Sequence, residues 1–426
     1  MRNFNKKTLA FAKGLHGKGI FFVMTCFSGT FVGYNPCSMN YSFDTIIDRS
    51  GTHSVKWDMR QAHFGNDKVM PFWVADMEFF SPPAVQQALQ QRIRHNCFGY
   101  TLMPESYWES FAAWAAKRHL WKPERESLQF SPGVIPALNF AIQSMTKPGD
   151  GVIIQPPVYH PFYNVVKRNR RKLLLNPLRL ENGRYHMDFE NLEEHLKNGA
   201  KAVILCNPHN PVGRVYTKQE LETLGEYCLR YGAKIVSDEI HWDIVYSEAV
   251  HVPIAALDKE LADITITATS PGKTFNLQGF NTAFVVISDK KLRQGFELAR
   301  HRNGIFMNNV PGITATEAAY SEGEAWLDDL LVYLEGNYRK MRNYIREEMP
   351  GVELIQPEGT YVAWLDFRMI PVDDIYRFMI EKAGVGLNNG LEFGEEGRGF
   401  LRFNFAAPRA MVEEGLEKMA AALKTL

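Results

Sequence analysis

The sequence predicts an α/β protein with a mostly parallel central sheet and a second, smaller α+β domain. From residue 85 to residue 325, short apolar segments rich in β-branched residues alternate with helical segments, which is the pattern of a layered α/β domain. After residue 326 this alternation gives way to one long helical stretch and then to separated strands. The chain has 426 residues, which is enough for both parts.

Five short apolar segments are expected to be buried parallel strands. They are VIIQ (152–155), AVILC (202–206), KIVSD (234–238), ITITA (264–268) and AFVVIS (283–288). The segment 217–231 is expected to be a helix, because Thr217 can cap its first turn and Glu220, three residues later, completes a capping box. Further along the chain we expect a helix over 326–349, followed by the strands TYVAWLDF and GFLRFNF.

The domain boundaries follow from these changes of pattern. Residues 39–90 are expected to contribute to the small domain, 91–325 to form the large domain and 326–426 to form the C-terminal small domain. Residues 1–38 are expected to be an N-terminal extension, either a tail or an overlong start of the sequence. Its lysines and the run GIFFVMTCFSGTFVG resemble a signal peptide, so export stays the alternative, but the run is too short to cross a bilayer.

Composition excludes several classes of function. The 48 Lys and Arg residues balance 48 Asp and Glu residues, so neither nucleic-acid binding nor membrane binding driven by bulk charge is expected. The five cysteines are odd in number and form no CxxC pair, which argues against a disulfide framework and a thiolate metal site. Buried thiols in a reducing compartment fit better, so we expect a cytoplasmic protein without a metal.

Three chemically informative side chains follow predicted strands. Asn210 lies in the loop NPHNPVGR after AVILC, Asp238 ends KIVSD, and Lys273 lies in TSPGKTFN after ITITA. In an open α/β sheet ligands bind beyond the carboxyl ends of the strands, so these three residues are expected to share one site. Asn210 alone is equally typical of a turn in a proline-rich loop.

This combination matches the needs of pyridoxal phosphate (PLP). A lysine in a partly dry site has a lowered pKa, and its neutral amine forms Schiff bases. A buried carboxylate such as Asp238 needs a cationic partner, and the protonated ring nitrogen of the cofactor provides one. Asn210 can donate a hydrogen bond to the cofactor hydroxyl.

A phosphate site and a ring-stacking residue are also predicted. The segment SPGVIPALNFAIQSM (131–145) places Gly133, Val134 and Ile135 at the start of an apolar helix, where free backbone N–H groups bind anions. Ser270 can add a hydroxyl to the same phosphate. Tyr159, which follows the strand VIIQ, offers a flat face to an aromatic ring.

The motifs FGYT (98–101), NPHNPVGR, SDEIHWDIVY, SPGKTFNLQGF and GRGFLRFNF together resemble the fold-type I, aspartate-aminotransferase-like PLP enzymes of aminotransferase class I/II. The motifs WVADMEF (73–79), SGTHSVKWD (50–58) and GEEGRGFLRFNF narrow the resemblance to the cystathionine β-lyase (MalY/PatB-type) branch. It extends from about residue 40 to the C-terminus. The extension 1–38 lies outside the family pattern.

The resemblance implies a role for each site residue. Lys273 is the Schiff-base lysine, Asp238 the partner of the pyridine nitrogen, Asn210 the donor to the cofactor hydroxyl and Tyr159 the stacking ring. Of these, Lys273, Asp238 and Tyr159 are expected to take part in catalysis. Position 272 is Gly where related enzymes often carry a small hydroxyl residue, so one phosphate contact is expected to be missing.

Two further roles concern the substrate and a second subunit. The resemblance implies that Arg402 binds the substrate α-carboxylate, and a guanidinium fork suits a carboxylate better than an ammonium does. It also implies that Tyr100 reaches the phosphate in the neighbouring subunit of a homodimer.

The resulting hypothesis is a carbon–sulfur β-lyase. It would cleave L-cystathionine and related cysteine S-conjugates to a thiol such as homocysteine, pyruvate and ammonia. An aminotransferase on the same scaffold is the alternative, because the two reactions differ only after Cα deprotonation. A regulatory protein that binds PLP is a second alternative.

Overall fold

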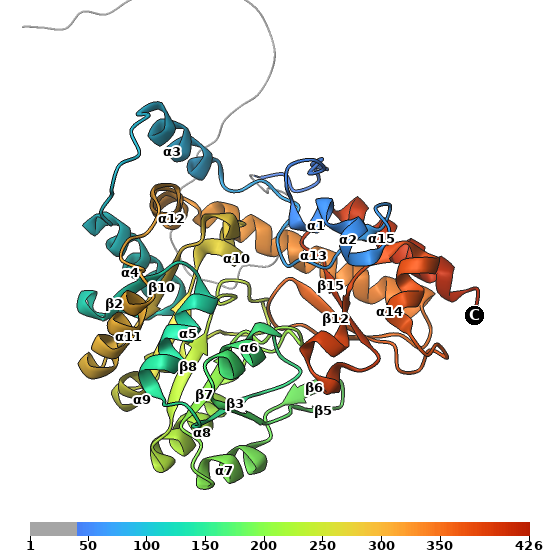
Figure 1. Ribbon diagram of the computed structural model, residues 1–426. Coiled ribbons are helices and arrows are strands. Elements are labelled where there is room, and N and C mark those ends of the chain that lie inside the picture. The colour runs from blue at the N-terminus through green and yellow to red at the C-terminus, as the bar shows by residue number, and fades with distance from the viewer. Residues whose placement is uncertain (1–40) are drawn as a thin grey trace, which may run out of the picture. The chain divides into compact units, whose positions relative to one another are not determined.

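Within residues 41–426, seven strands form the central sheet, in the order β2-β10-β9-β8-β7-β3-β4 (Figure 1). Their bounds are Leu128–Ser131 (β2), Gly151–Ile154 (β3), Lys172–Leu175 (β4), Ala202–Cys206 (β7), Lys234–Asp238 (β8), Thr265–Thr269 (β9) and Ala283–Val286 (β10). The five strands predicted from the sequence are confirmed, to within a few residues at their ends.

The predicted direction of one strand is wrong. AFVVIS was expected to be parallel, but β10 pairs antiparallel with both β2 and β9, whereas the other neighbouring pairs are parallel. A buried strand is apolar in either direction, so its composition carries no signal for orientation. The edge strands β2 and β4 were not predicted; β4 has two exposed and two half-buried residues and therefore lacks a fully apolar pattern.

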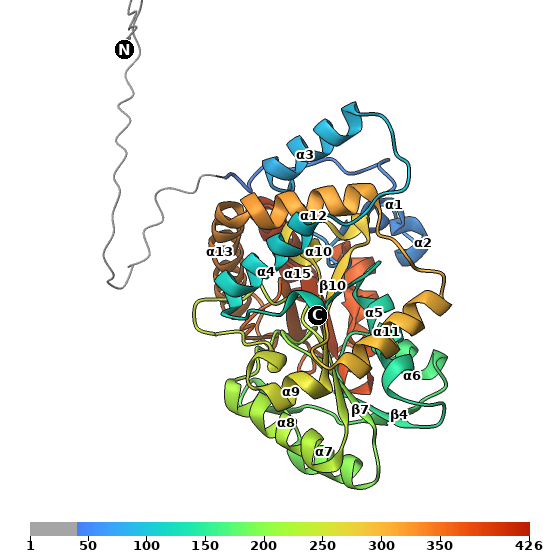
Figure 2. The ribbon, with the colours of Figure 1, turned by 90° about the vertical axis from the view of Figure 1, so that its left-hand side faces the viewer.

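Helices cover both faces of this sheet because successive strand residues point to opposite faces. On β7, Ile204 and Cys206 join one hydrophobic cluster, with α5 (Val134–Met145), α6 (Pro161–Arg168) and α11 (Lys290–Arg302). Val203 and Leu205 join another, with α7 (Phe189–Lys197), α8 (Lys218–Tyr231) and α9 (Lys259–Ile264). Figure 2 shows these two groups of helices on opposite sides of the strands.

The C-terminal part contains a second sheet, antiparallel and four-stranded, in the order β11-β12-β15-β14. Its strands are Glu353–Ile355 (β11), Val362–Asp366 (β12), Asn388–Asn389 (β14) and Phe400–Asn404 (β15). The long helix predicted over 326–349 is α13 (Glu324–Glu348), and α15 (Arg409–Leu423) packs against it. The predicted helix and the two predicted strands are confirmed.

The N-terminal segment is joined to this second sheet region by a short strand pair. β1 (Met70–Pro71) pairs in parallel with β13 (Val385–Gly386). The domain boundaries at residues 90 and 325 stay a prediction, since residues 40–426 cluster as one unit. The remaining α-helices and β-strands of residues 41–426 are α1 (Val55–Asp58), α2 (Arg60–Phe64), α3 (Pro83–Arg94), α4 (Glu105–His119), β5 (Arg179–Glu181), β6 (Arg184–His186), α10 (Pro271–Phe275), α12 (Val310–Glu322) and α14 (Ile375–Phe378).

This computed structural model describes residues 41–426. Within that range, no helix combines the length and the apolar character needed to span a bilayer. The predicted extension over 1–38 lies outside the described residues, as do Cys26 and Cys37. The other three cysteines are free thiols; Cys97 is exposed, and Cys206 and Cys228 are buried.

Candidate active site

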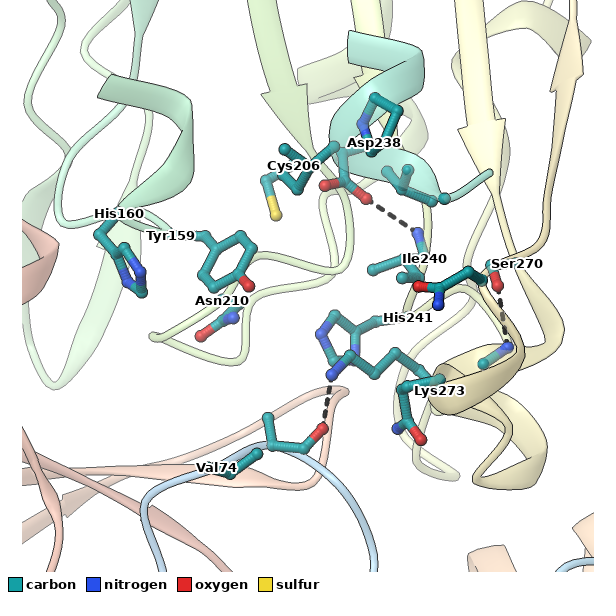
Figure 3. Close-up of a pocket in the computed structure, with 18 of the residues that line it drawn as sticks. Val74, Tyr159, His160, Cys206, Asn210, Asp238, Ile240, His241, Ser270 and Lys273 are labelled. Atoms are coloured by element: carbon teal, nitrogen blue, oxygen red, sulfur yellow. Dashed lines mark hydrogen bonds between the residues drawn. The ribbon is translucent and has the colours of Figure 1, made fainter. Parts of the chain in front are cut away.

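A cavity of about 600 Å³ lies at the carboxyl ends of β3, β7, β8 and β9 (Figure 3). Nine of the ten predicted site residues line it: Gly133, Val134, Ile135, Tyr159, Asn210, Asp238, Ser270, Lys273 and Arg402. The tenth, Tyr100, lies outside the cavity, with 96% of its surface exposed.

Lys273 is presented by a short helix directly after β9. Ser270 caps this helix, α10: its Oγ accepts a hydrogen bond from the backbone N–H of Gly272 at 3.0 Å. The Lys273 amine enters the cavity and donates to the carbonyl oxygen of Ala75 (Figure 3). Burial of the amine, together with the nearby charge of Arg402, lowers the pKa of Lys273 to about 8. A substantial fraction is therefore neutral at physiological pH, as a nucleophile or general base requires.

Asp238 is a buried acid at the end of β8. Its Oδ1 accepts a hydrogen bond from the backbone N–H of Ile240 at 3.1 Å (Figure 3). Burial raises the pKa of Asp238 to about 7, against the opposing effects of that hydrogen bond and the charge of Lys273. Among residues 41–426 it forms no ion pair. A ligand that brings a protonated ring nitrogen would supply the missing partner.

Arg402, on β15, is a buried cation whose hydrogen-bond partners are uncharged. Its Nη1 donates to Oδ1 of Asn210 at 3.0 Å. Its Nη2 donates to Oδ1 of Asn388 at 2.6 Å and to the carbonyl oxygen of Trp73 at 2.8 Å. Nε is buried without a hydrogen-bond partner in the described part of the chain, and burial lowers the pKa of Arg402 to about 10. A buried guanidinium without a counter-ion is suited to an anionic ligand, above all a carboxylate.

The amino end of α5 forms the anion-binding side of the cavity. Val134 and Ile135 are its first residues, and Gly133 precedes them with φ of 139°, a conformation that residues with a side chain rarely adopt. Backbone N–H groups of a first helical turn have no partner within the helix and therefore suit a phosphate. Ser270 lines the same side, and its hydroxyl donates to the carbonyl oxygen of Thr282 at 2.7 Å.

His241, three residues after the end of β8, is a buried imidazole. It lines the cavity, and its Nδ1 has no hydrogen-bond partner among the described residues. Burial, with the charges of Lys273 and Arg402, holds the pKa of His241 well below its usual value. The ring is therefore neutral and has a nitrogen free for a ligand.

Several lining residues were not predicted from the sequence: His63, Trp73, His160, Cys206, Asn388 and Glu392. Four of the six come from the N-terminal segment or the C-terminal part. Trp73 begins the motif WVADMEF, but no role in the site was predicted for this residue. Asn389 caps a short 3-10 turn, Gly390–Phe393. The adjacent Asn388 and Glu392 nevertheless reach the cavity, a fact that a turn motif does not reveal.

Comparisons with known proteins agree with this geometry. Residues 67–419 match the family "Aminotransferase class I and II". Cystathionine beta-lyase PatB of Bacillus subtilis (strain 168) is 42% identical over 90% of this chain and all of that protein, and protein MalY of Escherichia coli (strain K12) is 32% identical over 91% and 100%. The crystal structure of cystalysin from Treponema denticola, which contains pyridoxal 5'-phosphate, superposes with a TM-score of 0.88 at 36% identity and covers 91% of this chain and 100% of cystalysin.

Proposed function

The chain belongs to the class I and II aminotransferase family, and on that basis we propose that it is a PLP-dependent carbon–sulfur β-lyase. Its substrates are L-cystathionine and related cysteine S-conjugates, and its products are a thiol such as homocysteine, pyruvate and ammonia. The observation that carries this proposal is one cavity that holds a buried amine, an acid and a guanidinium. Within residues 41–426 the acid forms no ion pair with a cation, and the guanidinium forms none with an anion.

The residues present fit the cofactor. Asp238 would hold the ring nitrogen protonated, Tyr159 would stack on the ring, Asn210 would donate to the hydroxyl, and Lys273 would bind the aldehyde carbon. The phosphate would lie against the amino end of α5 and Ser270. When bound, PLP supplies an electron sink for negative charge at the substrate Cα.

The protein's own residues then bind the substrate and move its protons. Arg402 binds the α-carboxylate through two parallel hydrogen bonds and fixes the direction of the Cα–H bond. The substrate amino group would take the place of Lys273 at the aldehyde carbon and so free the lysine. The neutral amine of Lys273 then removes the Cα proton, a contribution of about 10²–10⁴-fold for general acid–base catalysis. The thiolate leaves from Cβ with its bonding electron pair, and the unsaturated remainder hydrolyses to pyruvate and ammonia.

The test is incubation of the enzyme with L-cystathionine in the absence of any keto acid. Stoichiometric pyruvate and free thiol support the lyase. Activity that requires 2-oxoglutarate and releases no net ammonia would identify the aminotransferase alternative instead. A protein that binds PLP but catalyses neither reaction would support the regulatory alternative.

We also propose that the active enzyme is a homodimer in which Tyr100 contacts the phosphate in the neighbouring subunit. In the isolated chain Tyr100 is 96% exposed, and the adjacent Phe98 and Leu102 are 54% and 74% exposed. Exposed apolar side chains grouped in this way are typical of an interface. The cytoplasmic location stays a prediction.

A further inference from the structure

Glu392 is an acid in the cavity to which the proposed function gives no task. Asp238 and Glu392 are the two carboxylates that line the cavity within the described residues, and Asp238 is assigned to the cofactor. Glu392 is half-buried, and among residues 41–426 it has no ion-pair partner. Its charge is therefore available to a ligand.

One amide separates Glu392 from the residue that binds the substrate carboxylate. The side-chain N–H of Asn388 donates to Glu392 Oε2 at 3.1 Å, while its Oδ1 accepts from Arg402 at 2.6 Å. The other oxygen of Glu392 accepts from the backbone N–H of Asn389 at 3.1 Å. A substrate held by Arg402 thus has a second, negative group within the same cavity.

The other groups around Glu392 do not neutralise it. His63, which stacks on Trp73 with ring centroids 4.0 Å apart, and His160 both line the cavity. Glu392 raises the pKa of both imidazoles, but burial lowers it by more, and the net shift for each is downward. Both rings are therefore mainly uncharged at neutral pH. The cation that acts on Glu392 within the described cavity is Arg402, whose charge the substrate α-carboxylate would balance.

We propose that Glu392 makes this enzyme select amino acids whose distal end carries an ammonium group over those whose distal end carries only a carboxylate. This inference rests on the proposed function in one respect, since it assumes that Arg402 binds the α-carboxylate. For a lyase, the favoured class is cysteine S-conjugates with a distal amine, of which cystathionine is one. Acidic keto acids and dicarboxylic amino acids are disfavoured.

Three six-carbon amino acids that contain no sulfur and no leaving group separate the effect of distal charge from leaving-group chemistry. L-Lysine ends in an ammonium, L-norleucine in a methyl group and L-2-aminoadipate in a carboxylate. Their dissociation constants from the PLP-loaded enzyme are measured from the absorbance of the bound cofactor. For the wild type we expect affinity in the order lysine, norleucine, aminoadipate. Any other order overturns the proposal, whatever the variants do.

The variant that tests the residue itself is Glu392→Gln. Glutamine is also accepted at this position of a capping box, but it carries no charge. The norleucine-to-lysine ratio of dissociation constants should fall about tenfold, the size expected for one charge-assisted hydrogen bond, and aminoadipate should bind more tightly. Glu395→Gln is the matched control, because Glu395 lies on the same loop, is 80% exposed and pairs with Arg398 outside the cavity. It should leave all three ratios unchanged.

Two results of the variant experiment would contradict the proposal. A ratio within threefold of the wild type would mean that Glu392 has no effect on the distal group. Equal weakening of all three ligands would mean that it only orients Asn388 and Arg402. Failure of the proposed function would look different. If the enzyme shows the predicted order of affinities but forms no pyruvate from S-(2-aminoethyl)-L-cysteine, the selectivity proposal stands and the lyase assignment is wrong.

Discussion

Asp238 shows how burial and chemistry are connected at the scale of one residue. Burial raises its pKa to about 7, so its ionised form is stabilised only when a cation is bound beside it. Asp238→Asn should retain PLP but slow turnover by at least about 100-fold, because an amide cannot keep the ring nitrogen protonated. Cofactor content and steady-state turnover, measured on the same preparation, test this. Near-normal turnover would leave Asp238 with a structural role only.

Lys273 gives a prediction of pH dependence. A lowered lysine pKa means that the neutral amine forms at lower pH than usual, so capture of PLP by the cofactor-free protein should accelerate as pH rises to about 8 and then level off. Stopped-flow absorbance between about pH 6 and pH 10 measures it. If Lys273 had the pKa of an ordinary lysine, the rate of PLP capture would continue to rise toward about pH 10. Lys273→Ala is the control; cofactor fixed by borohydride on another lysine of this variant would contradict the assignment.

Two substitutions of Arg402 distinguish the contribution of its charge from that of its planar shape. Arg402→Ala should reduce kcat/KM at least about 100-fold, since two hydrogen bonds to a charged group are lost. Arg402→Lys keeps the charge but not the planar fork, so it should restore only part of the loss. Part of the effect should appear in kcat, because the carboxylate contact also orients the Cα–H bond. An efficiency within threefold of wild type in the alanine variant would assign the carboxylate to another residue.

At the scale of elements, α8 tests whether a local sequence motif stabilises this fold. The Thr217 hydroxyl oxygen accepts from the backbone N–H of Glu220, and the Glu220 carboxylate accepts from the backbone N–H of Thr217. Thr217→Ala should lower the free energy of unfolding by about 1 kcal/mol and leave turnover unchanged, because α8 does not line the cavity.

Denaturant unfolding measures this difference. Thr223→Ala, at a half-buried position in the middle of the same helix, is the matched control and should not destabilise the protein. If both variants lost the same free energy, the capping box would not be the cause.

At the scale of the whole molecule, the prediction concerns assembly. Light scattering should give the mass of a dimer. Tyr100→Phe keeps the exposed aromatic ring and removes only the hydroxyl, so it should preserve the dimer but weaken PLP binding about tenfold. Equilibrium dialysis of PLP measures the second effect. A fully active monomer would exclude a role for Tyr100 across subunits.

The sequence by itself determined five of the seven strands in the described central sheet and the residues that follow them. The sequence predicted one site for Asn210, Asp238 and Lys273, because a residue that follows a buried parallel strand lies at the carboxyl edge of the sheet. Each of these positions depends on a short continuous segment. Local pattern and chain order are therefore sufficient to place them.

Only the tertiary structure decided the direction of β10, the edge strands and the outer wall of the cavity. An apolar run contains no information about strand direction, and a half-exposed edge strand lacks the apolar pattern of a buried one. Arg402 contacts Trp73 across 329 positions of the chain and Asn210 across 192. Contacts of that kind depend on how the N-terminal segment and the C-terminal sheet pack together, so no segment taken alone specifies them.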